Sequence, residues 1–459
     1  MRYLSIIMFT AIMVVSCQIE DENAPKPEDA FIKYYGELTS YEANDIEIVY
    51  DATGEVPEGL VVFGSVASEN GDDDFYVLIT DLVGNIVSSN SYELRNDLPD
   101  NDEDGNTDFP DIRSNDIAGQ IIANPIGGFV FVGTSSFSQD PGISDYQVGR
   151  LAFINADLEL SYDTFFVVDG DYNLDFALND ITLLQDQSFI LGGCRQYNRG
   201  GGIIDKDNYF VKYDQNSGIV FEQTQGVAGN NEDDEISRVF EKPNGNLVFV
   251  GTSSTPSQRG ENGGNNGANV FYLETDPNGT PLNSAAYGFD DGTSNNIVYN
   301  ELVNNAIYTT SGFSIVGTSS TTTTNQKFAF VMNLSNNGIF LSGNSHDSSA
   351  YNTENSVLQT IGEGITQGLD NELVVVGQYP AFSSGGLSRG GEGMFVKFDQ
   401  GGTPVEGEES SFGLSDGNDN IVDAVTLPDG KIVMVSNVDF GAGVKLISII
   451  KLNPDGSLD

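Results

Sequence analysis

A short apolar segment that ends in glycine recurs along the chain, and this repeat constrains the fold more than any other feature. Six copies end in Gly and a seventh ends in Ser: residues 60–64, 129–133, 189–192, 247–251, 313–317, 373–377 and 432–436. Neighbouring copies end 59 to 69 residues apart. Self-similarity at a nearly fixed period indicates repeated units, each too small to bury its apolar face alone.

Each copy has a partner strand on either side. A second apolar segment follows it, and Asn-Gly or Asp-Gly pairs such as Asn337-Gly338 and Asp455-Gly456 then predict hairpin turns, because these residues tolerate positive φ. A third strand precedes it, opened by a polar residue beside Ile or Val: Asp45-Ile46, Asp116-Ile117, Asp180-Ile181, Glu235-Ile236, Asn296-Ile297, Ser356-Val357 and Asn420-Ile421. A polar strand after each hairpin turn brings the count to four.

Four antiparallel strands per repeat is the composition of a propeller blade. The last repeat ends after its third strand, whereas a spare strand at residues 31–36 precedes the first repeat. We therefore predict an all-β fold, a single β-propeller of seven four-stranded blades closed by the N-terminal strand, spanning residues 31–459. The alternatives are an open stack of β-repeats or two smaller propellers.

The repeats also resemble the sixty-residue, propeller-like repeats of exported bacterial proteins. That family has the motif Gly-x-Val-x-Val-Gly-Thr, which appears at residues 128–134 and less fully at residues 246–252. The resemblance implies how the blades pack and implies nothing about activity.

The N-terminus has the features of an export signal. Arg2 is followed by an apolar run too short to span a bilayer, and Ser16 precedes Cys17. Val14-Val15-Ser16-Cys17 resembles a bacterial lipobox, and the acidic stretch at residues 18–22 resembles the surface-export signals of Bacteroidota lipoproteins. The resemblance implies a signal peptide at residues 1–16, lipidation of Cys17, a flexible tether at residues 17–30, and an outer-membrane anchor facing the exterior. An ordinary secretory signal is the alternative.

The charge balance excludes one class of partner. The chain has 68 Asp and Glu residues against 19 Lys and Arg residues, which gives a net charge of −49. Such a polyanion is unsuited to neutralising phosphates, so nucleic acid is not an expected partner. Trp, the side chain most often used to stack on sugars, is absent from the sequence.

Long loops are expected on one face of the propeller, and binding residues concentrate on long loops. Six of the eight arginines beyond residue 16 lie on them, with several aromatic residues. The candidate ligand-binding residues are Arg195, Tyr197, Arg199, Arg259, Tyr379, Phe382 and Arg389. Guanidinium and aromatic groups together suit a carboxylated or sulfated sugar. The competing interpretation is that each arginine pairs with a nearby Asp.

One segment predicts a metal site. Residues 100–111 place Asp100, Asp102, Asp104, Asn106, Asp108 and Asp111 around a turning Gly105. The spacing resembles the calcium loop of EF-hand and dockerin sites, although Asp111 replaces the usual final Glu. We therefore expect Ca²⁺ as a cofactor, with a solvated acidic loop as the alternative.

Catalytic signals are sparse. The single histidine, His346, lies among Ser and Asp residues and is expected at the surface, so a Ser-His-Asp triad is not expected. The first functional interpretation is a non-catalytic outer-membrane, cell-surface lipoprotein that binds a glycan or another surface protein through its loop-rich face. The second is a polysaccharide-acting hydrolase or lyase, which a carboxylate pair in a deep central pocket would favour. The third is a structural part of an outer-membrane uptake complex.

Overall fold

A computed structural model describes residues 30–458. It leaves out residues 38, 52, 69–70, 94–112, 139–145, 167–174, 201–202, 227–232, 255–266, 289–298, 322–325, 347–358, 381 and 385–386. The described part is all-β and contains no helix, hence none that is long and apolar enough to cross a membrane.

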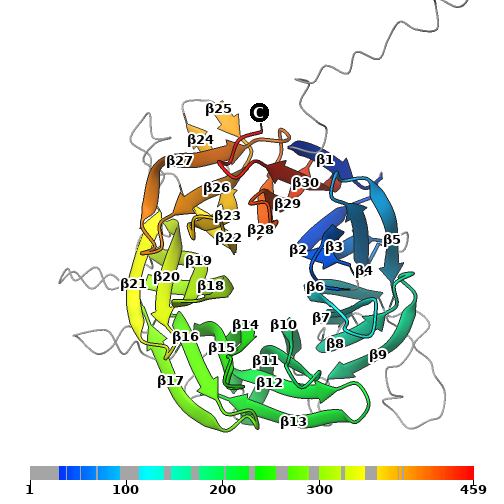
Figure 1. Ribbon diagram of the computed structural model, residues 1–459, viewed down its shortest axis with the longest axis vertical. Coiled ribbons are helices and arrows are strands. Elements are labelled where there is room, and N and C mark those ends of the chain that lie inside the picture. Colours follow the sequence, from blue (N-terminus) through cyan, green and yellow to red (C-terminus); the bar gives the residue numbers. More distant parts are fainter. Residues whose placement is uncertain are drawn as a thin grey trace, which may run out of the picture.

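The strands form seven four-stranded antiparallel units, which we number in chain order (Figure 1). Unit 1 comprises β2 (Tyr41–Tyr50), β3 (Pro57–Ala67), β4 (Asp73–Asp81) and β5 (Ile86–Tyr92). Unit 2 comprises β6 (Arg113–Ala123), β7 (Phe129–Ser138), β8 (Tyr146–Ile154) and β9 (Leu160–Phe166). Unit 3 comprises β10 (Phe176–Leu183), β11 (Phe189–Gly200), β12 (Ile203–Asp214) and β13 (Gly218–Gln225). Unit 4 comprises β14 (Glu235–Glu241), β15 (Leu247–Ser253), β16 (Asn269–Thr275) and β17 (Pro281–Tyr287).

Unit 5 comprises β18 (Tyr299–Thr309), β19 (Gly312–Thr321), β20 (Lys327–Ser335) and β21 (Phe340–His346). Unit 6 comprises β22 (Ile361–Gln367), β23 (Leu373–Tyr379), β26 (Glu392–Phe398) and β27 (Pro404–Phe412), with a small hairpin of β24 (Phe382–Ser384) and β25 (Leu387–Arg389). Unit 7 comprises β28 (Asn420–Thr426), β29 (Ile432–Asp439), β30 (Lys445–Leu452) and β1 (Phe31–Tyr35). A single parallel bridge between Asp73 and Asn115 joins units 1 and 2 into one eight-stranded sheet.

Two predictions about the strands are confirmed. Every Gly-ended or Ser-ended segment lies in the second strand of a unit, and the spare N-terminal strand β1 pairs antiparallel with the C-terminal strand β30. The side chain of Tyr35 also donates a hydrogen bond of 2.8 Å to the carbonyl of Gly84 in unit 1. The first strand of the chain is thus held by its last strand and by the neighbouring unit.

The core lies between units rather than within them. In β3, Val61 and Phe63 pack towards unit 2, whereas Leu60 and Val62 pack towards unit 7. Alternate residues of a strand point to opposite faces of its sheet, so a strand buried on both faces must be apolar throughout. This explains the continuous apolar segments of the sequence. The seven clusters of buried residues each join two adjacent units.

The innermost strands contact one another in the order β2, β6, β10, β14, β18, β22 and β28, and β28 contacts β2 again. Figure 1 shows these strands around the middle of the molecule, with the outer strands β5, β9, β13, β17, β21 and β27 at the periphery.

The repeated glycine has a steric cause. A Cβ atom on Gly64 would lie 1.9 Å from the carbonyl oxygen of Glu42, and one on Gly317 would lie 1.9 Å from that of Leu302. In both units the inner strand approaches closely at this point because its pairing register shifts just beyond it. In unit 3 the residue at this position is Gly193 rather than the adjacent Gly192.

Candidate functional site

The candidate site is built by an irregularity that recurs in every inner strand. The register between first and second strands shifts at an equivalent point in each unit, after residues 43, 118, 178, 236, 303, 362 and 421, and unit 1 has a second shift near its hairpin. A β-bulge of this kind inserts an unpaired residue and re-aims the side chains that follow it. The residues directly after the bulges include Asp45, Asp180, Arg238, Asn305 and Asp423, and all five line one pocket.

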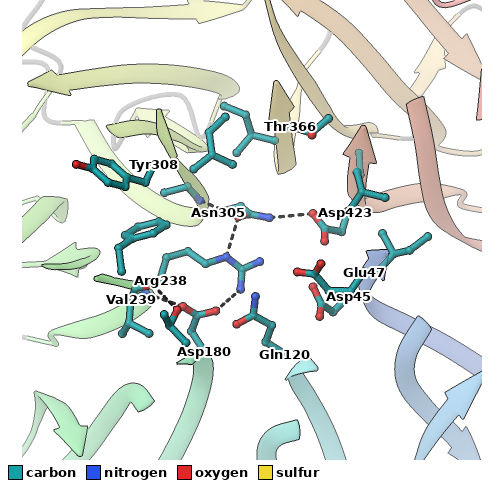
Figure 2. Close-up of a pocket in the computed structure, with 18 residues that line it drawn as sticks. Asp45, Glu47, Gln120, Asp180, Arg238, Val239, Asn305, Tyr308, Thr366 and Asp423 are labelled. Carbon is teal, nitrogen blue, oxygen red and sulfur yellow. Dashed lines mark hydrogen bonds and ion pairs between the residues drawn. The ribbon is translucent and has the colours of Figure 1, made fainter. Parts of the chain in front are cut away.

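This central pocket has a volume of about 380 Å³. Figure 2 shows its polar side chains converging from several strands, with Glu47 and Gln120 beside the five residues above. Phe240, Tyr308 and Thr366 also line this pocket. Because these residues follow the bulges, the pocket lies towards the tight hairpins that join the first and second strands.

A second pocket of about 460 Å³ is lined by residues at and before the bulges, including Asn44, Asn179 and Asn304. Arg238 and Asn305 line both pockets, so they lie between them. The amide groups of this second pocket tie neighbouring units together: Asn44 donates to the carbonyl of Gly119 over 2.6 Å and Asn304 donates to that of Gly362 over 2.6 Å.

A chain of hydrogen bonds crosses the central pocket (Figure 2). Arg238 donates from Nη1 to Asp180 Oδ1 over 2.9 Å and from Nε to Asn305 Oδ1 over 2.7 Å. Asn305 donates from Nδ2 to Asp423 Oδ1 over 3.0 Å. The carboxyl group of Asp423 lies beside that of Asp45 and raises its pKa (Figure 2). Four units therefore meet in one hydrogen-bonded network, supplied by β10, β14, β18 and β28.

The same side chains also bind the backbone of the next unit. Ile121 N donates to Asp45 Oδ2 over 2.9 Å, Ile181 N donates to Gln120 Oε1 over 3.0 Å, and Val239 N donates to Asp180 Oδ2 over 2.5 Å. Each of these bonds satisfies a backbone N–H near a bulge. The pocket residues are consequently held in place by the assembly of units, which preorganises them.

Burial dominates the electrostatics of the pocket. It raises the pKa of Asp45 well above its usual range and the pKa of Glu47 to about 8, and the neighbouring carboxyl groups add to both shifts. Burial also raises the pKa of Asp180 and of Asp423 to about 6, against the opposing effect of Arg238. Burial disfavours the charge of Arg238, but the surrounding aspartates outweigh it and raise the pKa of the guanidinium.

Most of the residues predicted as sites from the sequence lie elsewhere. Cys17, the calcium loop at residues 100–111 and Arg259 fall outside the described residues. Tyr197 and Arg199 lie in β11, and Phe382 and Arg389 pair in the hairpin β24–β25; only their backbones are described.

The two remaining candidates are described in full. Arg195 is half-buried in β11, where its backbone lies between those of Phe176 and Asp207. Tyr379 is 7% exposed and belongs to the core cluster between units 5 and 6. Neither residue lines either central pocket. A binding surface on the long loops therefore stays a prediction.

Three other residues can be compared with expectation. The surface position predicted for His346 is wrong: the residue is 5% exposed, because Nε2 lies 3.3 Å from Glu409 Oε2 and the ring packs edge-on against Phe398, both in unit 6. Cys194 is buried in β11, and burial raises the pKa of its thiol to about 12. Arg238 lies within the strand β14, and the sequence did not predict its role in the central pocket.

A signal for the central site was present in the sequence. Asp45-Ile46 and Asp180-Ile181 were identified as strand openings, and both aspartates follow bulges. In units 4 and 7 the predicted strand openings start three residues too early. Glu235 precedes Arg238, and Asn420 precedes Asp423, by three positions, and it is Arg238 and Asp423 that follow the bulges.

Comparison with known proteins identifies no family. No family model matches the chain, and no curated protein matches it. Among solved structures, the chain is similar to a polysaccharide lyase described as a PL25 ulvan lyase, with a TM-score of 0.48, 10% identity, and coverage of 93% of this chain and 97% of that one.

Two further structures are similar to the same degree. The periplasmic gluconolactonase of Pseudomonas aeruginosa has a TM-score of 0.46 and 10% identity, over 86% of this chain and 97% of that one. A protein of unknown function from Dyadobacter fermentans has a TM-score of 0.45 and 12% identity, over 73% of this chain and 94% of that one. Likeness this distant carries no activity over to this chain, so its function has to be argued from the pocket itself.

Proposed function

We propose that this chain is a single, closed, seven-bladed β-propeller that binds a small hydroxyl-rich ligand, such as the end of a glycan, in the central pocket at Arg238. The observation that carries the proposal is a preorganised pocket in which donors and acceptors from several units converge. We further propose that the protein is exported and anchored to the outer membrane through a lipid on Cys17, which rests on the N-terminal sequence alone.

Closure of the propeller is supported by two features. The innermost strands contact one another in cyclic order, and the buried clusters between units follow the same cycle. The pairing of β1 with β30 supplies the fourth strand of unit 7 from the opposite end of the chain. A closed ring of this kind leaves no inner sheet edge open to another chain.

The lining indicates the chemical class of the ligand. Sugar hydroxyls donate and accept hydrogen bonds, which suits carboxyl, amide and guanidinium groups placed together. Within the described chain, Arg238 Nη2 and Gln120 Nε2 have no hydrogen-bond partner, so both donors remain for a ligand. Phe240 and Tyr308 add apolar surface, and the volume falls within the range of small-molecule sites.

The pocket is not on the face predicted from the sequence. It lies towards the tight hairpins, whereas the long loops that carry Arg195 and Arg259 were expected to form the opposite face. The proposal keeps the glycan ligand of the sequence-based interpretation and assigns it to the central pocket instead of the loop face.

To test the proposal, the full chain is screened against a glycan library, and each glycan that binds is then titrated calorimetrically. Arg238→Lys keeps the positive charge but loses the planar guanidinium group, which can donate two parallel hydrogen bonds. The affinity for the glycan is therefore expected to fall at least about tenfold. Arg195→Lys makes the same replacement on the predicted loop face and is expected to leave affinity unchanged. If Arg195→Lys abolishes binding while a folded Arg238→Lys retains it, the central pocket is not the ligand site.

A second function is favoured by one observation, the neighbouring carboxyl groups of Asp45 and Asp423 in the central pocket. Two carboxyl groups with raised pKa values can exchange a proton with a substrate near neutral pH. Such an exchange suits the proton abstraction of a polysaccharide lyase. Product formation from polysaccharides, lost in Asp423→Asn, would establish this activity.

A further inference from the structure

We propose that the ligand of the central pocket carries a protonated amine, as an amino sugar does, and that Glu47 receives it. The inference rests on the proposed glycan-binding function and adds the substrate class. Four carboxyl groups line the pocket, from Asp45, Glu47, Asp180 and Asp423, and Arg238 is the one cation among the pocket residues.

These carboxyl groups are not equally engaged. Asp180 accepts hydrogen bonds on both oxygens, from Arg238 and from Val239 N. Asp423 accepts one from Asn305, and Asp45 accepts one from Ile121 N.

Glu47 differs from the three aspartates. In the described part of the chain no side chain donates a hydrogen bond to its carboxyl group, which points into the pocket (Figure 2). A half-buried acceptor that has no side-chain donor suits a ligand cation.

The charge of the pocket favours a cation over an anion. Arg238 is already bonded to Asp180 and Asn305, so its charge is offset before any ligand arrives. An anionic sugar would place its charge beside Asp45, Glu47 and Asp423. An ammonium group instead offsets carboxylates that are costly to bury unpaired.

Binding should therefore be coupled to proton release. The titratable groups that face Glu47 are Asp45 on its own strand, Asp180, Arg238, Tyr308 and Asp423; β6 and β22 contribute the neutral Gln120 and Thr366. With the pocket empty, burial raises the pKa of Glu47 to about 8, so this group is protonated at neutral pH. An ammonium group beside it favours the carboxylate, and the proton leaves to solvent.

Three disaccharides that differ only at C2 test the inference: the β-1,4 dimer of glucosamine, its N-acetylated form, and cellobiose. Each is titrated calorimetrically into the full chain at pH 6, where the amine is protonated. Each titration is repeated in two buffers of different ionisation enthalpy, and the difference between the two binding heats gives the number of protons released. We expect the glucosamine dimer to bind about tenfold more tightly than cellobiose, the size expected of one hydrogen bond to a charged group, and to release protons that cellobiose does not.

Glu47→Gln supplies the decisive variant, because it keeps the shape of the side chain and removes its charge. The preference for the amine over cellobiose should disappear, and proton release should fall. The control is Glu55→Gln, the same replacement on the exposed hairpin after β2.

Equal binding of all three sugars by the parent would overturn the amine inference and leave the proposed function standing. An amine preference that persists in Glu47→Gln would overturn it as well. No binding of any glycan would overturn both.

Discussion

Replacing Glu47 by glutamine is expected to stabilise the protein at neutral pH and to leave its stability unchanged in acid. Burial, aided by the charge of Asp45, raises the pKa of Glu47 from 4.5 to about 8. In the unfolded chain the same carboxyl group has lost its proton by pH 7. Folding at pH 7 must therefore take up a proton, which opposes folding.

The size of the effect follows from the two pKa values. A raised pKa in the folded state contributes stability that is complete below pH 4.5 and is lost as the pH rises towards 8. Each pH unit above 4.5 costs about 1.4 kcal/mol, so the loss reaches about 3 kcal/mol at pH 7. Glutamine is neutral at every pH and avoids this cost. The variant should exceed the parent by about that amount at pH 7 and match it at pH 4.5.

Denaturant unfolding of parent, Glu47→Gln and Glu55→Gln between pH 4.5 and 8.5 measures this difference. Burial also raises the pKa values of Asp116 and Glu363 to about 7, so the parent itself should lose stability as the pH rises. Subtracting the parent at each pH isolates Glu47, and Glu55→Gln corrects for the change in net charge. A difference between Glu47→Gln and the parent that is constant across this pH range would refute the reasoning.

Three further predictions concern parts of the chain outside the pocket. Cys17→Ser should release the protein from bacterial membranes into the soluble fraction, and unchanged membrane partition would contradict lipidation. Deletion of residues 31–36 removes β1 and exposes an edge of β30, so the melting temperature should fall sharply and aggregation should increase; melting within a degree or two of the parent would contradict a structural role for β1. Calcium at the ~10⁻⁴ to 10⁻³ M typical of extracellular sites should give a saturable heat that Asp102→Ala with Asp104→Ala abolishes; an identical response in the double variant would mean that no site exists.

The repeat could be recognised from the sequence because its cause is local. Val61 and Val62 face opposite units, so both have to be apolar, and the apolar run is visible whatever surrounds it. Hairpins such as that at Gly338 require a residue with positive φ in the turn, and the Asn-Gly pair predicts this turn from the sequence. The pairing of β1 with β30 was predictable because the last repeat has only three strands and one spare strand precedes the first repeat.

The binding residues could not be recognised in the same way. Loops on a rigid scaffold often bind ligands, so the sequence favours the arginines on the long loops. Arg238 lies within a strand and carries no such signal, and the polar sequence neighbours of His346 predict a surface position. In both cases the deciding contacts come from strands far away in the chain: Asp180 and Asn305 for Arg238, and Glu409 for His346.

The sequence by itself determined the strands, their number per repeat and the pairing of the two ends, since these depend on periodicity and turn chemistry within short segments. Only the tertiary structure decided the site. A bulge at an equivalent point of each inner strand re-aims a side chain, and the cyclic contacts of the inner strands bring Asp45, Asp180, Arg238, Asn305 and Asp423 into one pocket. Their protonation likewise depends on several units, because the burial that raises the carboxyl pKa values arises when strands of separate units pack together.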